Sequence, residues 1–328
     1  MRFAALLMVI LALAFPALAQ QEARDDRGFL QGLLEDNLSD AGREVRIEGF
    51  EGALSSRATI EKLTIADDTG IWLTLNDVVL DWSRKALLDG RLEVNELKAG
   101  EILLPRRPAT AGEPAADKAP AQPFALPELP VAVNIARLAA DKVVIGKAVF
   151  GQAAELSMAA ALKLEAGDGS AAMAVKRTDR PGALTLDASF ANATGILALN
   201  MELTEGPNGI AATLLRLPGR PAVELAVKGT APLSDYRADI RLATDGQPRL
   251  TGAVTLAAEG PAEAPGRRFG AELSGNMGPL FAPDLRPFFG DSARFALSGH
   301  STADGAVTLD DFTLRTAELD LSGALELA

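Results

Sequence analysis

Apolar and polar residues alternate along most of this chain. Residues 71–75 carry an apolar side chain at every second position, and the same period returns in six later segments. These segments are 184–190, 197–203, 223–227, 236–242, 250–256 and 319–327. A period of two is that of a β-strand with one apolar and one wetter face. The pattern therefore predicts a mainly β protein whose strands share an apolar side.

Turn signals separate these runs. The segment Asp67–Gly70 predicts a turn, and four Asp-Gly or Asn-Gly dipeptides predict hairpins. These dipeptides are Asp168-Gly169, Asn208-Gly209, Asp245-Gly246 and Asp304-Gly305. At Asn76-Asp77 the apolar set moves from odd to even positions. Such a change of parity predicts a bulge or a tight turn.

Few segments have the period of a helix. Residues 85–88 predict one helical turn, and residues 279–290 predict a short helix that packs over part of the apolar side. Its apolar residues are Phe281, Leu285, Phe288 and Phe289. Residues 29–38 predict a short N-terminal amphipathic helix, which plugs the end of the sheet or lies on a membrane. Plugging is favoured because the polar face of this helix is acidic.

The first residues have the pattern of an export signal. Met1-Arg2 is followed by an apolar run and by Ala17-Leu18-Ala19. A basic start, a short apolar run and an Ala-x-Ala ending are typical of a secretory signal peptide cleaved after Ala19. An uncleaved inner-membrane anchor is the alternative, although the run is shorter than the roughly 20 residues that a bilayer span prefers. Both hypotheses place residues 20–328 outside the cytoplasm, in a bacterial periplasm.

A proline-rich segment divides the remaining chain. Residues 105–130 contain seven of the nineteen prolines, mixed with Ala, Glu and Lys, and predict a linker or a long exposed loop. We expect four parts: a signal or anchor at 1–19, a helix plus β module at 24–104, this linker, and a repetitive β region at 131–328. The last part is expected to be incomplete at its C-terminus, because the strand pattern stops abruptly.

Composition excludes several classes of function. The formal net charge of −12 opposes nucleic-acid binding, and the absence of cysteine excludes thiolate metal sites and cysteine nucleophiles. His300 is the only histidine, and its Ser-Gly-His-Ser-Thr context indicates a surface turn. Neither a phosphate-binding loop nor a Gly-x-Ser-x-Gly motif is present. We therefore expect no enzymatic activity, no metal site and no cofactor.

The apolar side of such a sheet must be covered. A closed sandwich, a transmembrane barrel, and an open trough that holds apolar guests are the three solutions. A transmembrane barrel carries aromatic girdles at both interfaces, whereas aromatic residues make up only 5% of this chain. The periodicity alone leaves the sandwich and the trough open.

Four segments carry a family resemblance. They are Gly-Arg-Glu-Val-Arg-Ile-Glu-Gly-Phe-Glu-Gly-Ala-Leu at 42–54, Ala-Asp-Asp-Thr-Gly-Ile-Trp-Leu at 66–73, Leu-Asp-Trp-Ser with Leu-Leu-Asp-Gly-Arg-Leu-Glu-Val in 80–94, and Ile-Leu-Leu-Pro-Arg-Arg-Pro at 102–108. Together they resemble the N-terminal region of the TamB family, in the AsmA-like superfamily of bridge-type lipid carriers. The resemblance covers about residues 28–108, and its motifs are structural rather than catalytic.

The resemblance implies an elongated, curved antiparallel sheet that forms an open apolar groove. It also implies transport of phospholipids between the inner and outer membranes, and a part in outer-membrane biogenesis and protein assembly. The family's partner is a TamA-like outer-membrane insertase, engaged through a C-terminal domain that is not visible in this sequence. We therefore expect an N-terminal fragment, a truncated product or a short relative.

The residues predicted to hold phospholipid acyl chains are apolar and alternate with polar ones. They are Leu197, Leu199, Met201, Leu203, Val223, Leu225, Val227, Ile240, Leu242, Leu319, Leu321, Leu325 and Leu327. Two other functions remain open. One is an assembly factor whose sheet edge pairs with nascent outer-membrane strands. The other is a secreted β-sandwich that binds an unrelated ligand.

Overall fold

The computed structural model describes residues 44–52, 56–109, 124–259, 266–302 and 306–327. The predicted signal segment and the helix expected at 29–38 lie outside this part of the chain. By their internal contacts the residues form two compact units. Unit 1 comprises the chain up to residue 113 with residues 129–166 and 175–179, and unit 2 comprises 114–128, 167–174 and 180–328. Each unit is described separately below.

The protein is mainly β, as predicted. In the described residues, sixteen strands form one sheet in sequence order, and this sheet does not close on itself. The strands are β1 (Glu44–Glu48), β2 (Arg57–Asp67), β3 (Gly70–Trp82), β4 (Arg91–Leu104), β5 (Ala132–Ile145), β6 (Ala154–Glu165), β7 (Asp168–Arg177), β8 (Gly182–Ala191), β9 (Ile196–Glu205), β10 (Val223–Pro232), β11 (Asp235–Thr244), β12 (Gln247–Glu259), β13 (Gly266–Gly275), β14 (Ala293–Ser301), β15 (Val307–Arg315) and β16 (Asp320–Leu327).

The sheet is mixed, so the prediction of a wholly antiparallel sheet was wrong. Strands β4 and β5 run parallel, with Arg91 beside Ala132 and Leu104 beside Ile145. A parallel pair needs a connection that returns along the whole strand length. Residues 105–131 connect these two strands, which both belong to unit 1. The described parts of this connection, 105–109 and 124–131, form no strand, and their prolines lack the backbone N–H that a ladder needs.

Unit 1 has a core at one end of β3, β4 and β5. Trp82, Leu92, Val94 and Val133 form a buried cluster, and Leu129 from the end of the return segment packs against it. Leu92 and Val133 are each only 1% exposed. Trp82 is therefore a core residue.

A buried ion pair closes the predicted turn between β2 and β3. Asp67 accepts hydrogen bonds from Arg106 Nη1 at 2.8 Å and Arg106 Nη2 at 2.6 Å, and also from the backbone of Ala109 at 2.7 Å. The Asp67 side chain is 4% exposed. The Arg106 guanidinium, followed by the Thr69 hydroxyl, holds the pKa of this carboxyl well below its usual range. The start of the proline-rich segment is thereby fixed to the β2–β3 turn.

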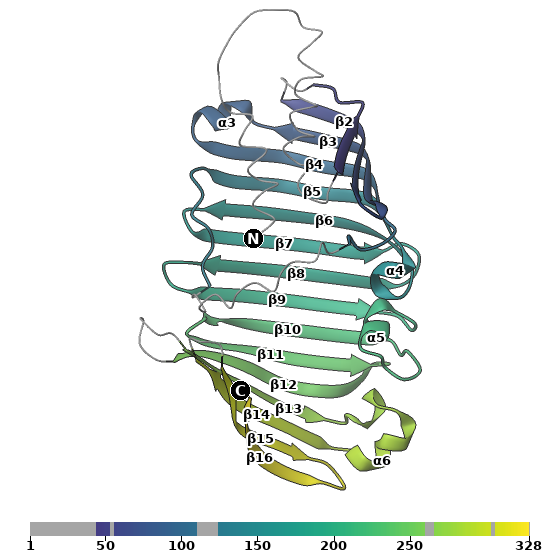
Figure 1. The fold of residues 1–328 in the computed structure, drawn as a ribbon, viewed down its shortest axis with the longest axis vertical. Coiled ribbons are helices and arrows are strands. Elements are labelled where there is room, and N and C mark those ends of the chain that lie inside the picture. Colours follow the sequence, from purple (N-terminus) through teal and green to yellow (C-terminus); the bar gives the residue numbers. More distant parts are fainter. Residues whose placement is uncertain (1–43, 53–55, 110–123, 260–265, 303–305, 328) are drawn as a thin grey trace, which may run out of the picture. The chain divides into compact units, whose positions relative to one another are not determined.

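The helices of the described residues are all short. They are α3 (Arg84–Leu88), α4 (Lys147–Phe150), α5 (Ile210–Leu214), η1 (Gly278–Leu280), η2 (Pro283–Leu285) and α6 (Arg286–Phe289). The single turn expected at 85–88 is α3, and the helix expected within 279–290 is split into three turns. In unit 2, α5 and α6 lie at the same end of the strands (Figure 1). Within the described part of the chain, no helix has the length and hydropathy needed to span a bilayer.

The hairpin predictions had mixed outcomes. Asp245-Gly246 turns between β11 and β12 with both residues at positive φ, as predicted. The prediction of a hairpin turn at Asp168-Gly169 was wrong, because the turn is made by Ala166-Gly167 and Asp168 already begins β7. The hairpin predicted at Asn208-Gly209 was also wrong, because these residues lead into α5. Asp304-Gly305 lies outside the described residues.

The parity change at Asn76-Asp77 does not make a turn. Strand β3 continues through it, with Asn76 opposite Lys62 and Val78 opposite Ile60 in the same register. Asp77 adopts a left-handed conformation with φ 52°. One residue at positive φ within a continuous strand therefore marks the point where the apolar positions change parity.

Candidate functional site

The register of unit 2 places the predicted apolar residues on one side of the sheet. Residues paired across antiparallel strands point to the same side. Leu225 lies opposite both Leu203 and Leu242, and Val227 lies opposite both Met201 and Ile240. We call this side of strands β8–β16 the apolar face.

The face continues across all nine strands. Further pairs on it include Leu186 with Met201, Leu242 with Leu250, Val254 with Ala271, Leu273 with Phe295, and Leu297 with Phe312. Acids and bases such as Glu202, Glu224, Lys228 and Arg241 lie on the opposite side, because their positions have the other parity. Period-two alternation in the sequence thus becomes a two-sided sheet.

Most of the thirteen predicted residues lie on this face within strands. Leu197, Leu199, Met201 and Leu203 are on β9, Val223, Leu225 and Val227 on β10, and Ile240 and Leu242 on β11. On β16, Leu321, Leu325 and Leu327 lie opposite Leu314, Leu309 and Val307. Leu319 precedes β16 and belongs to no strand. Leu319 and Leu321 are 36% and 46% exposed.

No second sheet lies on the apolar face in the part of unit 2 that the structure describes. Every extensive strand–strand contact there joins strands that neighbour each other in the sheet. Leu199, Met201, Leu203, Leu225 and Val227 are accordingly half-buried. A sandwich core would bury such residues almost fully.

One end of the face is covered. Ala212 of α5, Leu217 and Val223 form a buried cluster, and Leu242 and Leu280 of η1 pack against it. Val223 is 1% exposed, so this residue is part of a closed core. Glu205 helps to hold α5 in place, because its Oε2 accepts a hydrogen bond from the backbone N–H of Ala211 at 2.7 Å.

The aromatic residues of the segment 279–290, which was predicted to cover the apolar face, pack mainly on one another. Phe281 stacks on Phe289 with ring centroids 4.1 Å apart, and Phe288 meets Phe289 edge-on at 5.1 Å. Phe281 and Leu285 remain 39% and 45% exposed. The predicted packing over the apolar face is therefore provided by Leu280.

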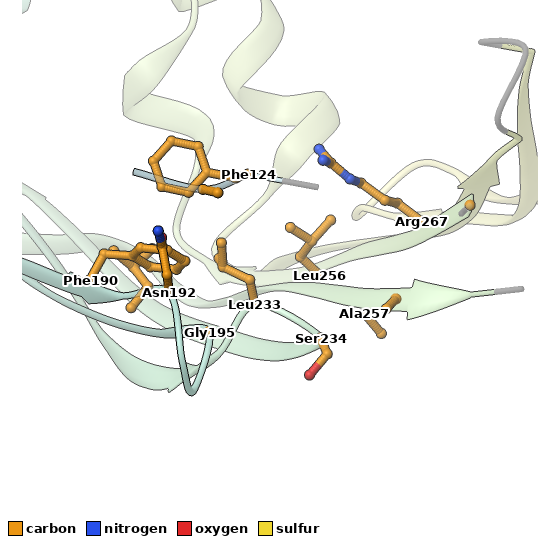
Figure 2. Close-up of a pocket in the computed structure, with 13 residues that line it drawn as sticks. Phe124, Phe190, Asn192, Gly195, Leu233, Ser234, Leu256, Ala257 and Arg267 are labelled. Carbon is orange, nitrogen blue, oxygen red and sulfur yellow. The ribbon is translucent and has the colours of Figure 1, made fainter. Parts of the chain in front are cut away.

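A pocket of about 560 Å³ lies at the opposite end of the strands. It is formed where the hairpin turns of β8–β9 and β10–β11 meet the end of β12 and the start of β13 (Figure 2). Its thirteen lining residues are Phe124, Ala125, Phe190, Asn192, Gly195, Leu197, Leu233, Ser234, Leu256, Ala257, Ala258, Gly266 and Arg267. Leu197 belongs to the predicted set, so the pocket is continuous with the apolar face.

The last part of the proline-rich connection, from Phe124 onward, forms one side of this pocket. The Phe124 ring meets the Phe190 ring edge-on, with centroids 5.0 Å apart. The side chain of Asn192 donates to the carbonyl of Leu126 at 2.9 Å and accepts from its N–H at 2.8 Å. These two hydrogen bonds fix the backbone beside Phe124 to the β8–β9 turn.

Among the described residues that line the pocket, Arg267 is the charged one. Leu256 lies opposite Phe269 and Ala258 lies opposite Arg267, so alternation puts Arg267 on the apolar face. Arg268, its neighbour in sequence, points to the other side and forms an ion pair with Glu259. The pocket therefore combines an apolar lining with one guanidinium.

Sequence reasoning missed this pocket. Phe124 lies in a segment predicted to be a linker, and Asn192, Leu233 and Arg267 lie at strand ends, where alternation stops. A large aromatic residue inside a proline-rich segment was the available signal, because solvated linkers rarely need one.

Metal-ligating side chains do not cluster in the described residues. No group of three or more His, Cys, Asp or Glu side chains there is placed to hold a metal ion. The sequence context of His300 predicted a surface turn, and this prediction was wrong. His300 lies in β14, and its Nδ1 is 2.9 Å from a carboxylate oxygen of Asp310.

Comparison with known proteins adds no identification. No protein family, curated protein or solved structure matches this chain.

Proposed function

We propose that this chain carries phospholipids along the apolar face of unit 2, in the periplasm, as the resemblance to the TamB family implies. In this proposal the face lines an open groove between the inner and outer membranes, and the transported lipids serve outer-membrane biogenesis and protein assembly. The observation that carries the proposal is a nine-strand apolar face whose leucines are only half-buried.

The hydrophobic free energy of an acyl chain is of the size needed for such a chain to cover the apolar face. Burial of one CH₂ group contributes about 0.8 kcal/mol, so a chain of roughly fifteen CH₂ groups loses about 12 kcal/mol when it enters water. Half-buried Leu, Val, Ile and Met side chains offer a comparable apolar surface. Such contacts have no preferred direction, so a lipid can slide along the strands without large barriers.

The test is photocrosslinking of the full chain in cells. A photoreactive amino acid at Leu199 or Leu225 should label phospholipid, whereas the same residue at Glu224 should not. Glu224 is the matched control because it is adjacent to Leu225 and lies on the opposite, solvated side. Mass spectrometry of lipids that copurify in mild detergent gives an independent measurement. Equal labelling at Leu225 and Glu224, together with no copurified phospholipid, would rule the proposal out.

A second function is favoured by the edge of the sheet. Among the described strands, β16 pairs with β15 on one side and with nothing on the other. Such an edge can accept another strand. An assembly factor that pairs with nascent outer-membrane strands would give crosslinks from Ser322 to barrel proteins, and no lipid labelling from Leu225.

A further inference from the structure

We infer that one end of unit 2 docks on an anionic lipid bilayer, with the exposed leucines of α5 in the membrane and the arginines that follow them at its phosphates. Two connections make the contact: residues 206–222 between β9 and β10, and residues 276–292 between β13 and β14. The connections at this end, which follow β9, β11, β13 and β15, all lie within the described residues. The docking goes beyond the proposed function and does not depend on it.

Large apolar side chains protrude from both connections. Leu214 and Leu215 of α5 are 54% and 52% exposed, and Phe281 and Leu285 are 39% and 45% exposed. Leu280 packs against the cluster that holds α5, so the two connections lie beside each other at the same end of the strands (Figure 1). Exposed apolar side chains that gather in one place mark a contact with a protein or a membrane.

The charge of the α5 connection favours a membrane. Residues 206–222 carry Arg216 and Arg220 and no acid, although the net charge of the chain is −12. Both arginine side chains are exposed. Exposed charges further apart than about 8–10 Å are largely screened at physiological salt, so these two arginines determine the attraction of this end to a surface. Leucines followed directly by exposed arginines suit the interface of an anionic bilayer.

The second connection supplies apolar surface. Residues 276–292 carry Arg286 together with Asp284 and Asp291, so their charges give no net attraction to an anionic surface. The side chains from Phe281 to Pro287 are exposed without interruption. The phosphate contacts therefore belong to the α5 connection, and this connection adds an apolar contact beside it.

The backbone at Arg216 gives no structural reason for an arginine. The N–H of Arg216 donates to the carbonyl of Thr213 at 3.2 Å, and the N–H of Leu217 donates to the carbonyl of Ala212 at 2.9 Å. These two bonds form a Schellman motif, whose left-handed position is usually taken by glycine. Arg216 occupies this position with φ 53°, which a residue with a side chain rarely adopts. Glycine would satisfy the local fold better, so the charge of Arg216 is what requires an explanation.

The base of α5 is fixed to the sheet. Ala212 and Leu217 are 1% and 7% exposed and form a buried cluster with Val223 of β10. The carboxylate of Glu205 accepts a hydrogen bond from the N–H of Ala211 at 2.7 Å. The exposed leucines therefore protrude from a supported turn, and their insertion into a bilayer requires little ordering of the chain.

The experiment reads membrane insertion at one site of the full chain. The chain has no cysteine, so Leu214→Cys can carry a single environment-sensitive nitrobenzoxadiazole label. Its emission should rise and shift to the blue on vesicles of phosphatidylcholine and phosphatidylglycerol at about 2:1, and far less on phosphatidylcholine alone. Ala193→Cys is the matched control, because it is exposed at the opposite end of the strands, and its emission should not change. A local label is needed because the apolar run at residues 3–15 can itself bind vesicles.

Arg216→Gly separates a membrane role from a structural one. In the labelled chain it should weaken the affinity for anionic vesicles about fivefold, which corresponds to about 1 kcal/mol for one basic residue near such a surface. The midpoint of thermal unfolding should stay unchanged or rise, because glycine suits the left-handed position. Arg220→Gln should weaken the affinity by a similar factor. Lys228→Gln removes the same charge from the solvated side of the sheet and should have no effect.

Several results would overturn the inference. They are an unchanged emission of the label at Leu214→Cys, an equal response to neutral and anionic vesicles, and an unchanged affinity in Arg216→Gly. A dimer of the full chain that dissociates in Leu214→Ser with Leu215→Ser, without any vesicle response, would show that this end is a protein interface instead. The proposed function is judged separately: lipid labelling from Leu225 in β10 persists if only the inference fails.

Discussion

The side-chain amide of Asn192 pairs with the backbone of Leu126 through two hydrogen bonds, of 2.8 and 2.9 Å. The two residues are 66 positions apart, and the side-chain amide pairs with the backbone of Leu126 as a neighbouring strand would, by donating one hydrogen bond and accepting another. These hydrogen bonds hold the last part of the proline-rich connection at one edge of the pocket. Asn192 at the β8–β9 turn and the ring contact with Phe190 thus both hold Phe124 in place.

Asn192→Ala should release this segment without unfolding unit 2. Two hydrogen bonds are lost, each with a net contribution of about 0.5–1.5 kcal/mol, and the segment itself adds little core. We expect faster backbone hydrogen exchange at residues 124–128 and a fall of about 1–2 kcal/mol in the free energy of unfolding. Asn200→Ala on β9 is the control, because no hydrogen bond of its side chain is described. Unchanged exchange at 124–128 in Asn192→Ala would show that other contacts hold the segment.

Two charges introduced on the same face should have different effects. Leu199 is half-buried, and no second sheet lies above it in the described part of unit 2, whereas Val223 is 1% exposed beneath Ala212 and Leu217. Val223→Asp should cost about 3–5 kcal/mol, because an unpaired charge enters a closed cluster. Leu199→Asp should cost less than about 1.5 kcal/mol, because its carboxylate can stay hydrated.

Chemical denaturation of the full chain measures both variants, and copurified phospholipid is counted in parallel. Leu199→Asp should lose bound lipid more than it loses stability. If Leu199→Asp is as destabilising as Val223→Asp, the side chain of Leu199 lies in a sealed core. The proposed open face would then be untenable.

Much of unit 2 could be predicted from alternation alone. The runs at 197–203, 223–227 and 236–242 became β9, β10 and β11, and their parity fixed which side is apolar, because side chains of a strand alternate by geometry. The pattern could not distinguish Val223 from Leu225, although both lie on that side. Their difference comes from Ala212 of α5 and from Leu217, which cover Val223 and leave Leu225 half-buried.

The same limit explains the other errors. Whether β4 and β5 run parallel depends on the path of residues 105–131 rather than on the strands themselves. At residues 166–169 two adjacent dipeptides, Ala-Gly and Asp-Gly, are both suited to a turn, and the turn falls on the first. The pocket escaped prediction because strand ends carry no periodic signal.

Tyr236→Phe should leave the protein as stable as wild type or more stable by about 1 kcal/mol. Tyr236 is 8% exposed, and within the described part of the chain its Oη is buried without a hydrogen-bond partner. Burial raises the pKa of this hydroxyl. Removing a polar atom that gains nothing in the folded state removes its desolvation cost. The free energy of unfolding from urea titration is the measurement.

Gly229→Ala provides the contrast to this substitution. Gly229 lies under Tyr236, and a Cβ there would come within 2.7 Å of the Tyr236 Oη and 2.4 Å of the Arg237 carbonyl oxygen. The variant should lose about 1–3 kcal/mol through overpacking. A fall in stability for Tyr236→Phe comparable with that of Gly229→Ala would mean that the hydroxyl has a partner.

His300 gives a pH signal that can be assigned without ambiguity, because it is the only histidine. Its Nδ1 contacts the Asp310 carboxylate at 2.9 Å, and this hydrogen bond raises the pKa of the imidazole above its usual 6.5. Glu259 raises it further, and Arg268 lowers it. A raised pKa means that the folded state favours the protonated ring.

The sign of the pH dependence follows from this shift. The contribution of the pair to stability is fully present below the ordinary pKa of 6.5 and is lost as the pH rises through the higher folded pKa. Asp310→Asn should therefore destabilise the protein at about pH 5.5 and have little effect at about pH 9, where the ring is neutral in both states. Hydrogen–deuterium exchange of the imidazole C–H reports its pKa directly and should show a lower value in Asp310→Asn. An identical imidazole pKa in the two proteins would mean that the carboxylate does not hold the proton in solution.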